Sequence, residues 1–145
     1  MLRAPLLAAA FVVVHAGAFA QATPVGLWKT IDDETKQEKS WVRIADNGET
    51  LSGKVEKIAD PAKKDSKCDQ CTDERKDKPV LGMTIVRNAK QSADDKEIWE
   101  GGDILDPNNG KVYRLRLKPI DGGKVLQVRG YIGPFFRTQT WLRVE

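Results

Sequence analysis

Residues 111–132 read KVYRLRLKPIDGGKVLQVRGYI, and this stretch decides the fold class. From Tyr113 to Lys118, apolar and basic residues alternate, and an alternation of apolar and polar residues resumes at 126–129 after the Asp-Gly-Gly of 121–123. Side chains of a strand alternate between its two faces, so this pattern predicts two half-buried strands joined by a tight turn. The apolar side chains on the predicted inner face are Tyr113, Leu115, Leu117, Leu126 and Val128.

Extended runs separated by turn signals recur along the chain. Asp-Asn-Gly at 46–48 and Asp-Pro-Asn-Asn-Gly at 106–110 are residue types that adopt the left-handed conformations of turns. No adequate window shows a helical stripe. The predicted strands span 25–31, 40–45, 50–58, 81–88, 96–105, 111–118, 124–132 and 137–144. We therefore predict an all-β fold, a single antiparallel up-and-down barrel of eight strands, with a sandwich as the alternative.

The first twenty residues differ from the rest. They carry Arg3, an apolar stretch over 6–14 and an Ala-Phe-Ala end at 18–20. These are the three parts of a cleavable signal peptide, and the apolar stretch is too short for a membrane span. We predict a signal peptide at 1–20, one domain at 21–145 and a periplasmic or secreted protein with no integral membrane segment after cleavage.

The chain has 145 residues and a single histidine, His15, which falls inside the predicted signal peptide. The remaining chain therefore lacks the imidazole needed for Ser-His or Cys-His catalysis, and the commonest ligand of zinc and copper sites. We also find no paired-carboxylate constellation for hydrolysis. The sequence predicts a protein that is not an enzyme, with no catalytic residues, no metal and no cofactor.

The two ends of the predicted barrel contain a closure pattern. Gly26 and Trp28 lie in the first predicted strand, and Arg143 lies in the last. In an up-and-down barrel these strands pair, and a guanidinium stacks well on an indole, as in lipocalin-like barrels. The alternative is an ordinary core tryptophan.

Eight short segments carry a resemblance to a known family. They are GLW (26–28), WVRI (41–44), GKV (53–55), KPVLGM (78–83), WEGGDILDP (99–107), GKVY (110–113), VRGYIG (128–133) and RTQTW (137–141). Together they resemble the secreted bacterial domain-of-unknown-function family 2147 (DUF2147), over essentially the whole chain after residue 20. The resemblance implies a lipocalin-like (calycin) barrel with a ligand cavity, and it implies no established reaction and no catalytic residues.

Cys68 and Cys71 form a Cys-x-x-Cys motif in a strand-free stretch over roughly 59–79. A thioredoxin-type redox site requires a helix after the first cysteine, and the polar residues 72–79 do not favour one. A zinc site would need carboxylates for its remaining ligands. A local disulfide formed in an oxidising compartment is the favoured interpretation. The many charges of 57–78 indicate a solvated loop.

Positive charge gathers near the C-terminus, where Arg114, Arg116, Lys118 and Arg129 form a basic stripe on neighbouring strands. The stripe is either a surface for an anionic envelope component or an ordinary solvated sheet face. The export signal and the modest net charge disfavour nucleic acid. The apolar loop 131–136 either gates a ligand, contacts a membrane or partner, or caps the barrel.

These observations predict a binding protein that holds a small apolar or amphipathic ligand in its barrel. The predicted ligand-contacting residues are Tyr113, Leu115, Leu117, Leu126 and Val128. The alternatives are a cell-envelope interaction module whose barrel is filled by side chains, and, less favoured, a thiol-disulfide redox protein using Cys68 and Cys71.

Overall fold

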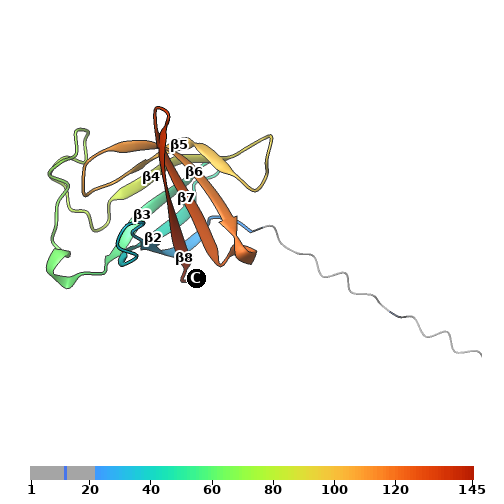
Figure 1. Cartoon of the computed structure of the whole chain (residues 1–145), viewed down its shortest axis with the longest axis horizontal. Helices are drawn as coiled ribbons and strands as arrows, with labels where there is room; N and C mark the ends of the chain where they lie inside the picture. The colour runs from blue at the N-terminus through green and yellow to red at the C-terminus, as the bar shows by residue number, and fades with distance from the viewer. Residues whose placement is uncertain (1–11, 13–21) are drawn as a thin grey trace, which may run out of the picture.

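A computed structural model describes residues 12 and 22–145, and the predicted signal peptide lies outside these residues apart from Val12. The described chain contains eight strands and two short 3-10 turns (Figure 1). The strands are β1 (Gly26–Ile31), β2 (Glu38–Asp46), β3 (Leu51–Ile58), β4 (Thr84–Gln91), β5 (Trp99–Leu105), β6 (Val112–Ile120), β7 (Val125–Ile132) and β8 (Phe135–Arg143). The 3-10 turns are η1 (Pro61–Lys63) and η2 (Asp121–Gly123).

The strands form a closed antiparallel barrel in which each strand pairs with the next and β8 pairs with β1. The predicted all-β, up-and-down, eight-stranded barrel is confirmed. The largest shifts from the predicted boundaries are in β4 and β5, which begin three residues later than expected. Local turns precede both strands, because the amide of Met83 bonds to the carbonyl of Val80 and the amide of Ile98 bonds to the carbonyl of Asp95.

Up-and-down topology places the connections alternately at the two ends of the barrel. The β1–β2 loop, the β3–β4 connection (59–83) and the β5–β6 and β7–β8 turns lie at one end, here called the mouth. The other end, here called the base, holds the start of β1, η2 and the end of β8. Any molecule entering the barrel therefore meets loops that come from four separate parts of the sequence.

The interior toward the base is filled by side chains. Trp28, Val42, Ile44, Leu117, Leu126 and Trp141 are almost completely buried in one hydrophobic cluster. Alternating inward positions supply these residues, because a strand in a barrel turns every second side chain to the inside. Burial of this apolar surface is the main term that stabilises the fold.

The ladder between β5 and β6 is interrupted by a bulge. Glu100 pairs with Arg116 and Asp103 pairs with Arg114, so β5 has one residue more than β6 over this interval. A Cβ atom on Gly102 would lie 2.0 Å from the backbone oxygen of Arg87. Glycine at this position therefore lets β5 approach β4 closely while the bulge separates it from β6.

Candidate functional site: the mouth of the barrel

At the base, Arg143 joins the ends of the chain. Its guanidinium donates hydrogen bonds to the backbone oxygens of Thr23 (2.7 Å), Val25 (2.9 Å) and Gly123 (2.5 Å). The same group stacks on Trp28, 4.2 Å from the ring centroid. Burial lowers the pKa of Arg143, but an arginine stays charged at physiological pH. Gly26 completes the arrangement, because a Cβ atom there would lie 2.4 Å from the backbone oxygen of Glu145.

At the mouth, the barrel contains a cavity of about 130 Å³. Inward-facing side chains of the strands and residues of the loops around the opening form its walls. The lining residues are Thr30, Asp32, Lys39, Ser40, Ile85, Ile104, Leu105, Asp106, Pro107, Asn108, Tyr113, Val128, Gly130, Arg137, Gln139 and Trp141. The opening therefore leads into an interior that the packed core closes below.

The cavity has an apolar part and a polar part. Ile104, Val128 and Trp141 provide apolar surface. On the polar side, the hydroxyls of Thr30 and Ser40 share a hydrogen bond of 2.9 Å, and Trp141 Nε1 donates to Gln139 Oε1 at 2.9 Å. A few fixed polar groups on a mainly apolar wall are the usual composition of a small-molecule site.

An ion pair joins two sides of the mouth. Arg137 on β8 contacts Asp33 in the β1–β2 loop through Nη2–Oδ1 at 2.5 Å and Nε–Oδ2 at 3.2 Å. The Arg137 hydrogen bond lowers the pKa of Asp33 below its ordinary value. Each carboxylate oxygen of Asp33 accepts from a different guanidinium nitrogen of Arg137. A paired contact of this kind fixes the orientation of the β1–β2 loop relative to β8 as well as the distance between them.

The predicted ligand-contacting residues separate into two groups. Tyr113 and Val128 line the cavity, whereas Leu117 and Leu126 are in the packed core alone; Val128 belongs to that core cluster as well. Leu115 is also buried and is not among the residues that line the cavity.

The prediction from the sequence did not include the polar cavity residues Thr30 and Gln139. Thr30 follows Trp28 by two positions, and Gln139 precedes Trp141 by two. Because residues two apart share a face, the inward tryptophans carried a signal for both.

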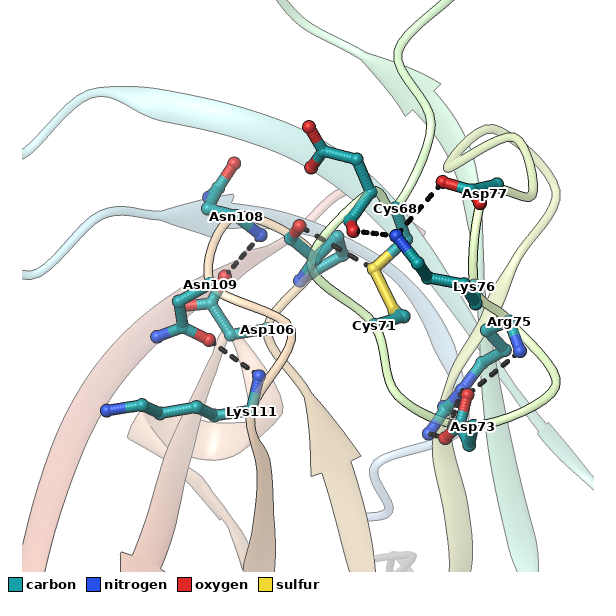
Figure 2. Close-up of a disulfide and its surroundings, with 12 residues drawn as sticks. Cys68, Cys71, Asp73, Arg75, Lys76, Asp77, Asp106, Asn108, Asn109 and Lys111 are labelled. Carbon is teal, nitrogen blue, oxygen red and sulfur yellow. Dashed lines mark hydrogen bonds and ion pairs between the residues drawn. A yellow bond between two sulfur atoms is a disulfide. The ribbon is translucent and has the colours of Figure 1, made fainter.

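Cys68 and Cys71 form a disulfide in the β3–β4 connection, as predicted from the sequence (Figure 2). Both residues are buried, with 0% and 2% of their surface exposed. Cys68 Sγ lies 3.7 Å from the carbonyl oxygen of Pro107 in the β5–β6 turn. The disulfide therefore packs the connection onto the neighbouring turn at the mouth.

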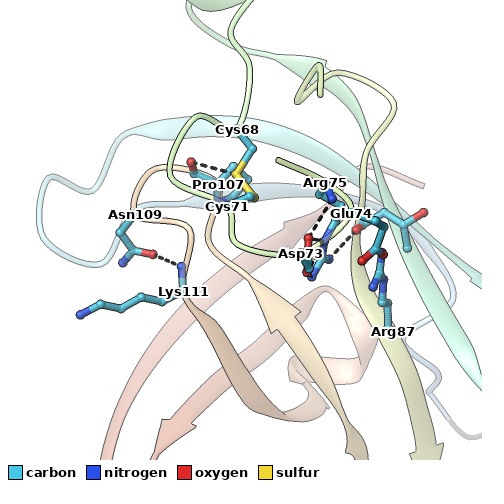
Figure 3. Close-up of polar contacts among 10 residues, drawn as sticks. Cys68, Cys71, Asp73, Glu74, Arg75, Arg87, Pro107, Asn109 and Lys111 are labelled. Carbon is cyan, nitrogen blue, oxygen red and sulfur yellow. Dashed lines mark hydrogen bonds and ion pairs between the residues drawn. A yellow bond between two sulfur atoms is a disulfide. The ribbon is translucent and has the colours of Figure 1, made fainter. Parts of the chain in front are cut away.

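The connection is mostly exposed, but one of its charged residues is buried. Arg75 is 95% buried, with Nη1 donating to the backbone oxygen of Thr84 at 2.9 Å and Nη2 contacting Asp73 Oδ2 at 2.6 Å. Hydrogen bonds from Arg75 lower the pKa of Asp73 to about 2. Glu74 also pairs with Arg87 on β4 (Figure 3). Most other charged side chains of 57–78 are exposed, as predicted for a solvated loop, while these contacts attach the segment to the barrel.

Among residues 22–145, no group of three or more His, Cys, Asp or Glu side chains is placed to hold a metal ion. Within the described part of the chain, no helix has the length and apolar character needed to cross a membrane.

A barrel of eight antiparallel strands, closed by an arginine on a tryptophan and hollow at its mouth, defines a lipocalin-like protein. The chain belongs to the bacterial family of uncharacterized proteins DUF2147, whose model matches residues 26–143. The fold is also that of a solved protein from the human pathogen Helicobacter pylori, HP1028, described as belonging to the lipocalin family. The two are 16% identical and superpose with a TM-score of 0.72, covering 86% of this chain and 84% of the other. No curated protein matches the chain in sequence.

Proposed function

We propose that this chain is a non-enzymatic binding protein of the periplasm or the secreted fraction, holding one small amphipathic molecule at the mouth of its barrel. The observation that carries the proposal is the cavity, whose lining combines apolar side chains with polar groups. The lipocalin-like fold supports it, because barrels of this size enclose one small ligand.

The dimensions of the cavity limit the ligand. About 130 Å³ is less than the roughly 300 Å³ at which drug-sized pockets begin. The site therefore suits a molecule of a few heavy atoms, or one end of a longer chain whose remainder leaves through the mouth. The apolar end would contact Val128 and Trp141, and a polar head would lie near Lys39 and Arg137 at the rim.

A second function, a cell-envelope interaction module, is favoured by a different observation. The interior below the cavity is already filled by buried side chains such as Trp28, Leu117 and Leu126. On this alternative the barrel serves as a rigid scaffold, and binding takes place on its outer surface.

A redox function at the cysteines is disfavoured by their surroundings. Thiol–disulfide exchange requires a thiolate to reach one of the two sulfurs. Cys68 and Cys71 are packed into the hydrophobic core cluster, and the Cys68 sulfur faces the Pro107 carbonyl. The disulfide is better suited to a structural role.

The test combines recovery of a bound molecule with a blocked cavity. Native mass spectrometry of protein taken directly from the periplasmic or secreted fraction is expected to show a small added mass, and thermal-shift screening with amphipathic compounds should identify the class. Val128→Phe fills the cavity and should abolish both signals. Val112→Phe, at an exposed position of β6, is the matched control and should retain them. An apo mass together with no stabilisation by any compound would contradict the proposal and favour the interaction module.

A further inference from the structure

The β7–β8 hairpin presents apolar side chains at its tip. Phe135 is 77% exposed, Phe136 is 57% exposed and Ile132 is 42% exposed. They surround the two-residue turn Gly133-Pro134, and the hairpin extends beyond its neighbours in Figure 1. Gly133 has a φ of 54° and proline fixes its own φ, so the exposed rings stand on a restricted turn. Exposed aromatic side chains at a loop tip are costly in water unless they contact a surface.

Two arginines lie against the aromatic rings next to the tip. The Arg129 guanidinium lies 4.6 Å from the centroid of Phe136, and that of Arg114 lies 5.6 Å from the centroid of Tyr131. The Tyr131 and Phe136 rings are themselves 5.8 Å apart. Within the described part of the chain, neither arginine forms an ion pair with a carboxylate. Aromatic faces hold these cations in position and leave their charge available to an external anion.

A groove lies one residue pair below the tip, on the outer face where the β5 bulge separates β5 from β6. Its lining includes Arg114, Arg116, Tyr131 and the bulge residues Gly101 and Gly102. Arg116 Nε is buried and has no hydrogen-bond partner among the described residues. The carboxylate of Glu100 also lines the groove, but it lies 3.6 Å from Arg116 Nη2 and the pair is about 40% exposed. The groove therefore has an unused donor and a net positive lining.

We propose that the β7–β8 hairpin docks the barrel onto an anionic phospholipid surface. Phe135, Phe136 and Ile132 enter the boundary between head groups and acyl chains, and Arg114, Arg116 and Arg129 contact lipid phosphates. Aromatic side chains favour the interface between head groups and acyl chains. Guanidinium groups next to them would then lie at the level of the phosphates, whose oxygens they bind through paired N–H donors. Cations this close to a membrane add to binding through the negative surface potential.

The docked orientation brings the mouth toward the lipid. Arg137, which lines the cavity, follows Phe136 directly in β8. A bound hairpin tip therefore places the cavity rim near the head groups, where amphipathic molecules are found. Docking uses the outer face of β6–β8 and is independent of a ligand in the cavity.

The experiment is co-sedimentation of the protein with vesicles of phosphatidylcholine alone and with vesicles in which about a third of the lipid is phosphatidylglycerol. Wild-type protein should bind the anionic vesicles and lose binding as salt rises. Phe135→Ser/Phe136→Ser should reduce binding roughly tenfold or more. Arg114→Gln/Arg129→Gln should do the same, because each cation near the surface contributes. Lys54→Gln/Lys90→Gln removes the same charge from exposed positions of β3 and β4, and should leave binding unchanged.

Four results would overturn the docking proposal, the fourth being the behaviour of a cavity variant. The first is an absence of binding to anionic vesicles, and the second is equal binding by the wild type and the phenylalanine variant. The third is release by free glycerol phosphate at low concentration, which would indicate a site for a soluble anion. Val128→Phe should bind vesicles as the wild type does, so a failed cavity proposal leaves this one intact. If Val128→Phe lost vesicle binding, lipid uptake into the cavity would be the cause and surface docking would be rejected.

Discussion

Trp28 and Arg143 are register partners in the β1–β8 ladder, and the guanidinium of Arg143 lies over the indole at 4.2 Å from its centroid. The pair closes the barrel with residues separated by almost the entire described chain. The same arginine donates to three backbone oxygens from two further segments, so one side chain connects the start of β1, η2 and the end of β8.

Replacing Arg143 with Met should destabilise the barrel by roughly 2–4 kcal/mol, because it removes the cation–π contact and leaves three carbonyl oxygens without their donor. Urea unfolding followed by tryptophan fluorescence measures the loss. Arg43→Met is the control, since Arg43 forms solvent-exposed ion pairs with Glu56 and Glu145, which water screens so that they add little to stability. Equal losses in the two variants would show that the closure contact contributes nothing of its own.

Gly110 fixes the position of the disulfide segment. A Cβ atom on Gly110 would lie 2.0 Å from the backbone oxygen of Gln70, and its φ is 72°. Gly110→Ala should therefore displace the β3–β4 connection and lower stability by roughly 2–3 kcal/mol. Gly122→Ala shares the positive φ, at 62°, but has open space around it. It should show the backbone strain of about 1 kcal/mol alone. Thermal unfolding compares the two, and a matching loss would exclude the predicted clash.

The buried disulfide should resist reduction in the folded protein. We expect no reaction with a thiol probe in native buffer, and slow reduction by dithiothreitol that accelerates in urea. Cys68→Ser/Cys71→Ser should lower the free energy of unfolding by about 2 kcal/mol, as expected for closure of so short a loop. Rapid native reduction coupled to turnover of a disulfide substrate would instead support the redox alternative.

Acid should weaken the attachment of the connection through Asp73. Arg75 holds the pKa of Asp73 at about 2, below the ordinary 3.8. The stability from this carboxylate is therefore fully present above pH 3.8 and is lost as the pH falls through about 2. Urea midpoints measured between pH 5 and pH 2 should fall more steeply for the wild type than for Asp73→Asn. Asp65→Asn, at an exposed position of the same connection, should follow the wild type; parallel curves for all three proteins would rule out this linkage.

Local patterns in the sequence determined the barrel. Alternation over 113–118 and 125–129 assigned inner and outer faces correctly, because a strand turns every second side chain to the same side. Asp, Asn and Gly marked the turns, and the pattern of Gly26, Trp28 and Arg143 favoured closure between the first strand and the last. The disulfide followed from the Cys-x-x-Cys spacing and the predicted compartment.

Only the tertiary structure decided which inward residues are core and which line a cavity. Leu117 and Val128 have the same pattern in the sequence and both pack in the core cluster, yet only Val128 also lines the cavity. The two are register partners in the β6–β7 ladder, so their level in the barrel is the same, and the difference depends on which side chains from the other strands pack against each of them. The burial of Arg75 could not be predicted from the sequence either, because it depends on the carbonyl of Thr84 and on a connection folded against the barrel. A residue's neighbours in sequence report its face, whereas its depth and its partners come from segments that meet only when the chain has folded.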